Sequence, residues 1–223
     1  HLDNHDDGIW LSDATPGKTA RLRAHYYGNI TMIDEKIGEM VDALRKKGLI
    51  DNTIIVFTSD HGNMLVDHAL FVKWSAYEAS IRVPLLVWYP KRYPGGRRTS
   101  RLAQTFDVVP ALLEEAKASV PEGRQWQSCA RFLRNEPSAE PERNYVFSMV
   151  GKSRQCPSTF SVVRSRQHKY VYYHDSESRE LYDLKKDPNE LVNLAFEPGY
   201  AALRAEYEDV RRVWMSSKGA RQA

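Results

Sequence analysis

An apolar run that ends abruptly in polar residues constrains the fold of this chain more than any other feature. Residues 53–57 read TIIVF, and Ser59, Asp60, His61 and Gly62 follow almost at once. The run is β-branched and continuous, and it comes after a helical pattern, which indicates a parallel sheet covered on both faces. Ligands of such sheets bind at the carboxyl ends of the strands, where Asp60 and His61 stand.

The segment before this strand has the periodicity of an amphipathic helix, which we place at about residues 21–47. Apolar side chains recur there every three or four positions: Tyr27, Ile30, Ile33, Ile37, Val41 and Leu44. Lys46 and Lys47 occupy the last turn and Gly48 follows, a combination that is typical of a helix end.

Further elements are predicted along the rest of the chain. A second buried strand covers residues 85–89, and a helix capped by Asp107 runs to about Lys117. Polar, proline-marked residues 137–143 predict a linker. Four short strands and a final helix then follow: 145–149, 160–164, 169–173, 180–184 and 200–214. We therefore expect two domains, 1–136 and 137–223.

Composition excludes several classes of protein. The net charge is +3, with acids scattered among the bases, which argues against a nucleic-acid partner. Cys129 and Cys156 have no CxxC partner, which argues against a zinc knuckle or a disulfide scaffold. No apolar stretch reaches the roughly 18 residues that a membrane span needs. The chain starts without a signal peptide or an initiator Met, so we expect a processed product or a piece of something longer.

The residues at the strand end have the chemistry of a metal site. The Asp60 carboxylate and the His61 imidazole are both donors to divalent cations, and Gly62 allows a sharp turn close to a bound group. The alternative is that Asp60 caps the following helix and His61 has no special role. Taken alone, so short a motif leaves the two interpretations equally weighted.

Three longer stretches carry a resemblance to a known family. They begin at Tyr26 (YYGNITMIDEKIGEMVDALRKKGLIDNTIIVFTSDHG, continuing to VPLLVWYP), at Phe106 (FDVVPALLEEA) and at Arg166 (RQHKYVYYHDSESRELYDLKKDPNELVNLA). Together they resemble the carboxyl-terminal half of the sulfatase catalytic domain, in the alkaline-phosphatase superfamily. The resemblance implies an α/β fold: part of a sandwich with a mainly parallel sheet, then a small antiparallel sheet packed by a carboxyl-terminal helix.

The resemblance also implies roles for individual residues. Asp60 and His61 match two ligands of the family's active-site divalent cation, usually Ca²⁺. Lys73 matches a catalytic, substrate-binding lysine that contacts the sulfate oxygens and the nucleophile. For His68 two readings stay open, a general acid that donates to the leaving oxygen and a structural histidine.

Some positions near these residues are expected to be structural, and some depart from the family. Glu78 and Arg82 are expected to form an ion pair that holds the loop against the next strand. Val66 and Ala69 stand where the family has glycine, and Asn63 replaces a frequent acid. We expect the two glycine replacements to stiffen the loop and narrow the pocket.

The family's nucleophile has no counterpart in the sequence. Sulfatases convert a Cys or Ser in C-x-P-x-R or S-x-P-x-R to formylglycine, whereas Cys156 begins CPSTF and follows the Asp-His-Gly motif, so we reject it. The amino-terminal acid pair of the metal site is also missing. For His1 and His5, near the chain start, two interpretations stay open: a solvated tail, or a histidine of the family's substrate-contacting loop. We expect the amino-terminal half, with its formylglycine, to be supplied separately, or the chain to be a truncation.

Three functions remain open from the sequence. The first is a sulfuric ester hydrolase component that acts on a sulfate ester once its amino-terminal half is present. The second, in the same superfamily, is a phosphonate monoester or phosphodiester hydrolase using Mn²⁺ or Zn²⁺. The third is a non-catalytic sulfatase-like binding module. The natural substrate and the localisation are not predicted.

Overall fold

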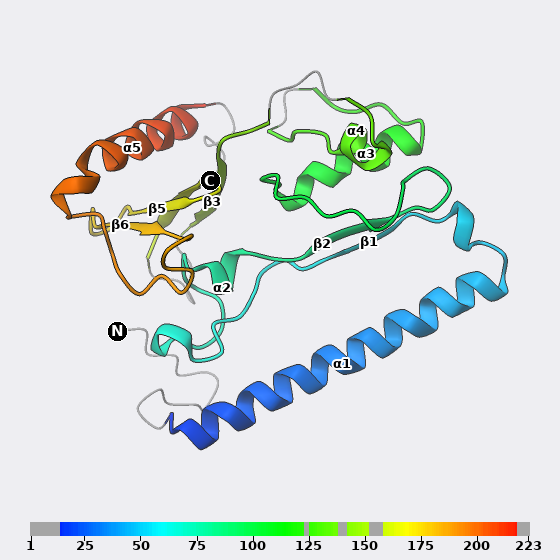
Figure 1. Cartoon of the computed structure of the whole chain (residues 1–223), viewed down its shortest axis with the longest axis horizontal. Coiled ribbons are helices and arrows are strands. Elements are labelled where there is room, and N and C mark those ends of the chain that lie inside the picture. The colour runs from blue at the N-terminus through cyan, green and yellow to red at the C-terminus, as the bar shows by residue number, and fades with distance from the viewer. Residues whose placement is uncertain (1–13, 123–124, 138–141, 152–157, 218–223) are drawn as a thin grey trace. The chain divides into compact units, whose positions relative to one another are not determined.

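The computed structural model describes residues 14–122, 125–137, 142–151 and 158–217 (Figure 1). Contacts group the chain into two compact units. The first contains the residues up to Ser75 together with 79–95, and the second contains 76–78 and the residues from Gly96 onward. The two-domain division at residue 136 stays a prediction. His1, His5 and Cys156 lie outside the described residues, as does part of the predicted linker.

A long helix, α1 (Pro16–Lys46), opens the first unit and confirms the predicted helix, which begins somewhat earlier than expected. Thr15 caps its first turn through its side chain. At the other end Gly48 has a φ of +65°. Its N–H donates to the Arg45 carbonyl at 3.0 Å, and the next N–H donates to Leu44 at 2.9 Å, which is the double closure of a Schellman motif.

Two short strands follow in the same unit, β1 (Ile55–Thr58) and β2 (Leu85–Trp88). They pair antiparallel, with Phe57 opposite Leu86. The parallel arrangement expected for these two strands is therefore wrong. A parallel neighbour requires a crossover that carries the chain back to the end of the sheet where β1 begins. Residues 59–84 instead start β2 beside the end of β1.

The expected burial of β1 is also wrong for the described residues. Directly opposed residues share a face of an antiparallel pair, and on one face Phe57, Leu86 and Trp88 are 40%, 57% and 39% exposed. Helix α1 has no buried residue, and Tyr27 and Ile33 of its apolar stripe are 59% and 49% exposed. The predicted apolar pattern is present, but no described layer covers it.

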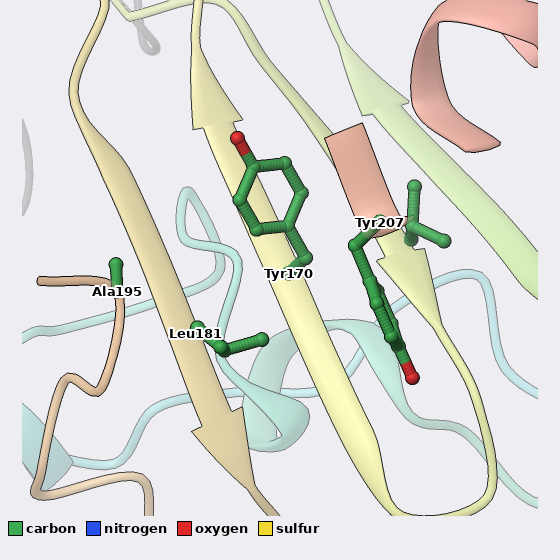
Figure 2. Packing of buried hydrophobic residues seen from close by; sticks show 5 residues of the cluster. Tyr170, Leu181, Ala195 and Tyr207 are labelled. Carbon is green, nitrogen blue, oxygen red and sulfur yellow. The ribbon is translucent and has the colours of Figure 1, made fainter. Parts of the chain in front are cut away.

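The second unit contains a four-stranded antiparallel sheet in the order β3-β4-β5-β6. Its strands agree with the predicted strands to within one residue: Val146–Val150, Phe160–Arg164, His168–Tyr173 and Arg179–Asp183. Helix α5 (Ala201–Ser216) packs on this sheet, as predicted. Figure 2 shows the core that they share: Val163, Tyr170, Leu181, Ala195 and Tyr207.

Shorter helices complete the two units: α2 (Glu78–Ile81), α3 (Val108–Glu115) and α4 (Ala130–Arg134). The predicted capping of α3 by the Asp107 side chain is wrong. That buried carboxylate accepts from the backbone N–H groups of Gln104 and Gln127, at 2.7 and 2.9 Å, and from Arg143 at 2.9 Å. The tertiary partner Arg143 competes for the carboxylate. Within the described residues, no helix is both long and apolar enough to cross a membrane.

Candidate active site

The chain turns sharply after β1 and passes very close to its own backbone. The Gly62 N–H donates to the Ser80 carbonyl at 2.7 Å, and a Cβ on Gly62 would lie 2.0 Å from the Ala79 carbonyl oxygen. Only glycine fits this approach. The predicted approach of Gly62 to a bound group stays a prediction, and the close neighbour that the structure shows is the chain's own backbone.

His61 is held in one tautomer by the next peptide group. Its Nδ1 lies 2.7 Å from the Gly62 carbonyl oxygen, which can only accept, so Nδ1 carries the ring proton. Nε2 therefore offers its lone pair. Nζ of Lys73 lies 2.8 Å from Nε2 and donates to it. The structure thus brings together two residues that the sequence proposed for one site.

Asp60 lies beside the same imidazole nitrogen. One carboxylate oxygen is 3.4 Å from Nε2 of His61, and the other accepts from the His61 backbone N–H at 2.9 Å. This backbone hydrogen bond lowers the pKa of Asp60 below its ordinary value, so the carboxylate is charged at neutral pH. The side chain is 82% exposed, which leaves its oxygens open to a ligand.

The two donors fit part of a site for a divalent cation. An anionic oxygen and an imidazole lone pair are side by side, and both are common ligands. Within the part of the chain that the structure describes, no third His, Cys, Asp or Glu joins them to complete a cluster.

Local contacts hold Lys73 in place. Its carbonyl accepts from the Ser80 hydroxyl and, at 2.7 Å, from the Ser75 N–H. Its ammonium lies 5.2 Å from the centre of the Trp74 ring, within the range of a cation–π interaction. Because contacts hold both its backbone and its ammonium, Lys73 has a fixed position before any ligand binds.

The loop of residues 63–72, which precedes Lys73, has a strained backbone. Five of its residues have left-handed φ values between +47° and +76°: Leu65, Val66, His68, Ala69 and Val72. A Cβ makes this conformation unfavourable by about 1–2 kcal/mol per residue, and a β-branched side chain makes it rarer still. Val66 and Ala69, the two positions at which the resembled family has glycine, are both among the five.

His68 lies in a short turn of this loop, Asp67–Ala69, with a φ of +54° and a half-buried side chain. Its proposed role as a general acid stays a prediction. Sequence reasoning missed a residue that holds this loop. Arg23 of α1 donates to the Leu65 carbonyl at 3.1 Å and to the Asp67 carboxylate at 2.7 Å. Asp67, the one acid among residues 63–72, is the sequence signal that could have indicated a basic partner.

In the second unit, Glu78 has a different partner from the one expected. Its carboxylate lies 3.1 Å from the guanidinium of Arg164, so the predicted ion pair with Arg82 is wrong. The prediction relied on sequence proximity, whereas the sheet supplies an arginine that is 86 positions away. The backbone N–H of Glu78 also donates to the Glu190 carboxylate at 2.7 Å.

A fully buried lysine lies in the same cluster and was also missed by sequence reasoning. Nζ of Lys169 donates to the Ala76 carbonyl at 2.6 Å and forms an ion pair with Glu190. Glu78 is 3.9 Å away. Burial lowers the pKa of Lys169, while the surrounding carboxylates oppose that shift. Such a residue usually serves to organise structure, here by holding residues 76–78 against the sheet.

Comparison with known proteins gives two family matches. A model described as Sulfatase matches residues 2–118, and one described as N-sulphoglucosamine sulphohydrolase, C-terminal, matches residues 66–213. The chain is 34% identical to a choline-sulfatase of Rhizobium meliloti over 202 residues, covering 88% of this chain and 38% of the relative. It is 35% identical to arylsulfatase K of Xenopus laevis, covering 78% of this chain and 34% of the relative.

Solved structures show the same likeness. A phosphonate monoester hydrolase of Agrobacterium radiobacter superposes with a TM-score of 0.81 at 31% identity, covering 91% of this chain and 42% of that one. A protein solved in complex with its substrate D-glucosamine-2-N,6-O-disulfate superposes with a TM-score of 0.79 at 29% identity, covering 86% and 40%. The chain thus spans less than half the length of the proteins that it matches.

Proposed function

Because this chain belongs to the sulfatase family, we propose that it forms the carboxyl-terminal part of the active site of a sulfuric ester hydrolase. The observation that carries the proposal is the convergence of three side chains at one point. Nζ of Lys73 is 2.8 Å from Nε2 of His61, and the Asp60 carboxylate is 3.4 Å from the same nitrogen.

Asp60 and His61 are the proposed ligands of the divalent cation, and Ca²⁺ is the ion we propose. A cation bound there would supply positive charge opposite an anionic ester. Lys73 supplies a second charge from the protein itself. In this structure one of its three N–H donors faces Nε2 of His61. A cation bound to that nitrogen would take the same lone pair, so all three donors would then be available to sulfate oxygens. Charge that develops on those oxygens in the transition state is stabilised by such fixed donors.

His68 is the proposed general acid for the leaving oxygen, in the protonated form of its imidazole. The proposed nucleophile is a formylglycine in an amino-terminal part of the protein that lies outside this sequence. We accordingly expect this chain alone to leave sulfate esters unhydrolysed.

Exposed apolar surface supports an amino-terminal partner. Phe57, Leu86 and Trp88 form one uncovered face of the β1–β2 ribbon, and α1 has an uncovered apolar stripe. Surfaces of this kind in a soluble protein usually mark an interface. The relatives are much longer than the aligned part of this chain, which covers 38% and 34% of the first two. We propose that their remaining part has a counterpart that covers these faces.

A second function in the same superfamily is favoured by one specific observation. The phosphonate monoester hydrolases of Agrobacterium radiobacter and Silicibacter pomeroyi both superpose with a TM-score of 0.81. An aryl phosphonate is also an anionic ester, and Asp60, His61 and Lys73 would meet it with the same charges. Mn²⁺ or Zn²⁺ would be the expected cation for that reaction.

The deciding experiment compares an aryl sulfate with an aryl phosphonate as substrates of this chain combined with its amino-terminal part. Lys73→Ala is assayed beside Lys36→Ala, which removes an exposed lysine that pairs with Glu39 on α1. Faster turnover of the sulfate that depends on Lys73 supports the sulfatase, and faster turnover of the phosphonate supports the second function. Absence of turnover of both esters would leave the non-catalytic module as the better account.

A further inference from the structure

Arg23 joins helix α1 to the strained loop of residues 63–72 at two points. Its Nε donates to the Leu65 carbonyl oxygen at 3.1 Å, and its Nη2 donates to the Asp67 carboxylate at 2.7 Å. These partners lie 42 and 44 positions away in the sequence. A planar guanidinium can hold two acceptors at once in fixed directions, whereas an ammonium acts as a single charged point.

The two contacts stand on either side of a β-branched residue with a left-handed backbone. Val66 has a φ of +76° although it is β-branched, and it lies between Leu65 and Asp67. A loop in this conformation relaxes unless surrounding contacts determine it. Arg23 supplies contacts of that kind, from a helix of 31 residues.

The conformation of the loop determines the position of the Lys73 backbone. The Met64 N–H donates to the Val72 carbonyl at 2.7 Å and the Val66 N–H donates to the Leu70 carbonyl at 3.0 Å, so the loop closes on itself. Val72 directly precedes Lys73. Opening the loop would therefore move the backbone from which the ammonium reaches His61.

We propose that Arg23 is a positioning residue that holds the loop of residues 63–72 in the conformation in which Lys73 contacts His61. The effect on turnover rests on the proposed function. The effect on the conformation of the loop and on the Lys73–His61 contact is independent of it.

The test uses amide hydrogen exchange in this chain, with Arg23→Ala, Arg23→Lys and the control Arg45→Ala. Arg45 is also on α1 and forms an ion pair with Asp42 at 2.8 Å, so the control removes an equal charge and a similar contact. We expect exchange of the Met64, Val66 and Leu70 amides to become roughly tenfold faster in Arg23→Ala, because local opening becomes easier. Arg23→Lys should recover part of the protection, and Arg45→Ala should change nothing in the loop.

The ring nitrogen of His61 provides a second readout, which a general loss of stability would not move. The ¹⁵N shift of Nε2 reports whether the nitrogen accepts a hydrogen bond from Lys73. We expect the shift to move toward that of a free lone pair in Arg23→Ala, and to stay in place in Arg45→Ala. Exchange in the paired amides of β1 and β2, which belong to the same unit as the loop, serves as the check that each variant is folded.

Unchanged loop exchange in Arg23→Ala, or equal acceleration in Arg45→Ala, would overturn the proposal. Failure of the proposed function looks different. If loop exchange depends on Arg23 while turnover by the completed protein ignores Lys73, the positioning role stands and the assignment of Lys73 to catalysis fails.

Discussion

The ammonium nitrogen of Lys73 lies 2.8 Å from Nε2 of His61, a residue 12 positions earlier in the chain. The Gly62 carbonyl makes this contact possible. Its oxygen lies 2.7 Å from Nδ1 of His61 and accepts the ring proton there, which leaves the lone pair on Nε2. A proposed metal ligand and a proposed sulfate-binding lysine are therefore neighbours through one nitrogen atom. The arrangement allows the two roles to be separated by mutation.

Lys73→Ala removes a cation that faces the developing charge of the transition state. In the protein completed by its amino-terminal part, we expect turnover of an aryl sulfate to fall about 100- to 1000-fold, or about 2.7–4 kcal/mol. Bound metal, measured by elemental analysis, should not fall, because an ammonium has no lone pair to offer a cation and its removal frees the lone pair on Nε2 of His61. A near-normal rate would remove Lys73 from the site.

Asp60→Asn removes the charge that a bound cation requires from this side of the site. We expect both metal content and rate to fall, and Asp51→Asn, at an exposed position just before β1, to leave both unchanged. Metal content is read by elemental analysis after dialysis. Parental metal binding in Asp60→Asn would mean that Asp60 serves only to bond the backbone of His61.

Gly62→Ala places a methyl group 2.0 Å from the Ala79 carbonyl oxygen. Because that neighbour is backbone, the turn must shift, and overpacking of this kind costs roughly 1–3 kcal/mol. The control is Gly28→Ala on α1, where a Cβ meets nothing within 4 Å. It should stabilise the chain by about 0.5–1 kcal/mol through helix propensity. Urea unfolding of both variants gives the comparison, and equal effects would contradict the crowding at Gly62.

Ala69→Gly and Ala24→Gly make the same change in opposite backbone conformations. Ala69 has a φ of +55°, whereas Ala24 is exposed in the middle of α1. At Ala69 the relief of about 1–2 kcal/mol of left-handed strain outweighs the added unfolded-state entropy, so we expect stability to rise. At Ala24 we expect a loss of about 1 kcal/mol. Thermal unfolding measures both, and a loss of stability in Ala69→Gly would argue against strain in the loop.

Glu180→Gln tests the electrostatics of the cluster around Lys169. Burial raises the pKa of Glu180 above its ordinary value, against the opposing effect of hydrogen bonds from Tyr182 and Tyr173. A raised folded-state pKa means that the folded protein holds the proton more tightly. Its stabilising contribution is complete below about pH 4.5, the unfolded value, and is lost as the pH rises through the folded pKa.

We therefore expect Glu180→Gln to raise the melting temperature at pH 7–8 and to change it little near pH 4. The control Glu177→Gln alters an exposed acid in the turn before β6 and should show no such pH dependence. A uniform shift of the melting temperature at all pH values would contradict the assignment.

Local sequence determined the elements of this protein. Residues 21–47 followed a helical period and ended in Gly48, and the strands of the carboxyl-terminal sheet were predicted to within a residue, because periodicity and turn residues act over a few positions. Three longer stretches, one of which includes the motif around Asp60 and His61, also indicated the family, which the comparisons confirm.

Tertiary structure decided the pairing of those elements and the contacts that build the site. It made β1 and β2 antiparallel, paired Glu78 with Arg164 in an ion pair and placed Arg23 against the loop before Lys73. None of these partners is within a helical turn of the other along the chain. Their choice depends on which surfaces pack together and on which buried charges must be matched, and neither is a property of any short stretch of sequence.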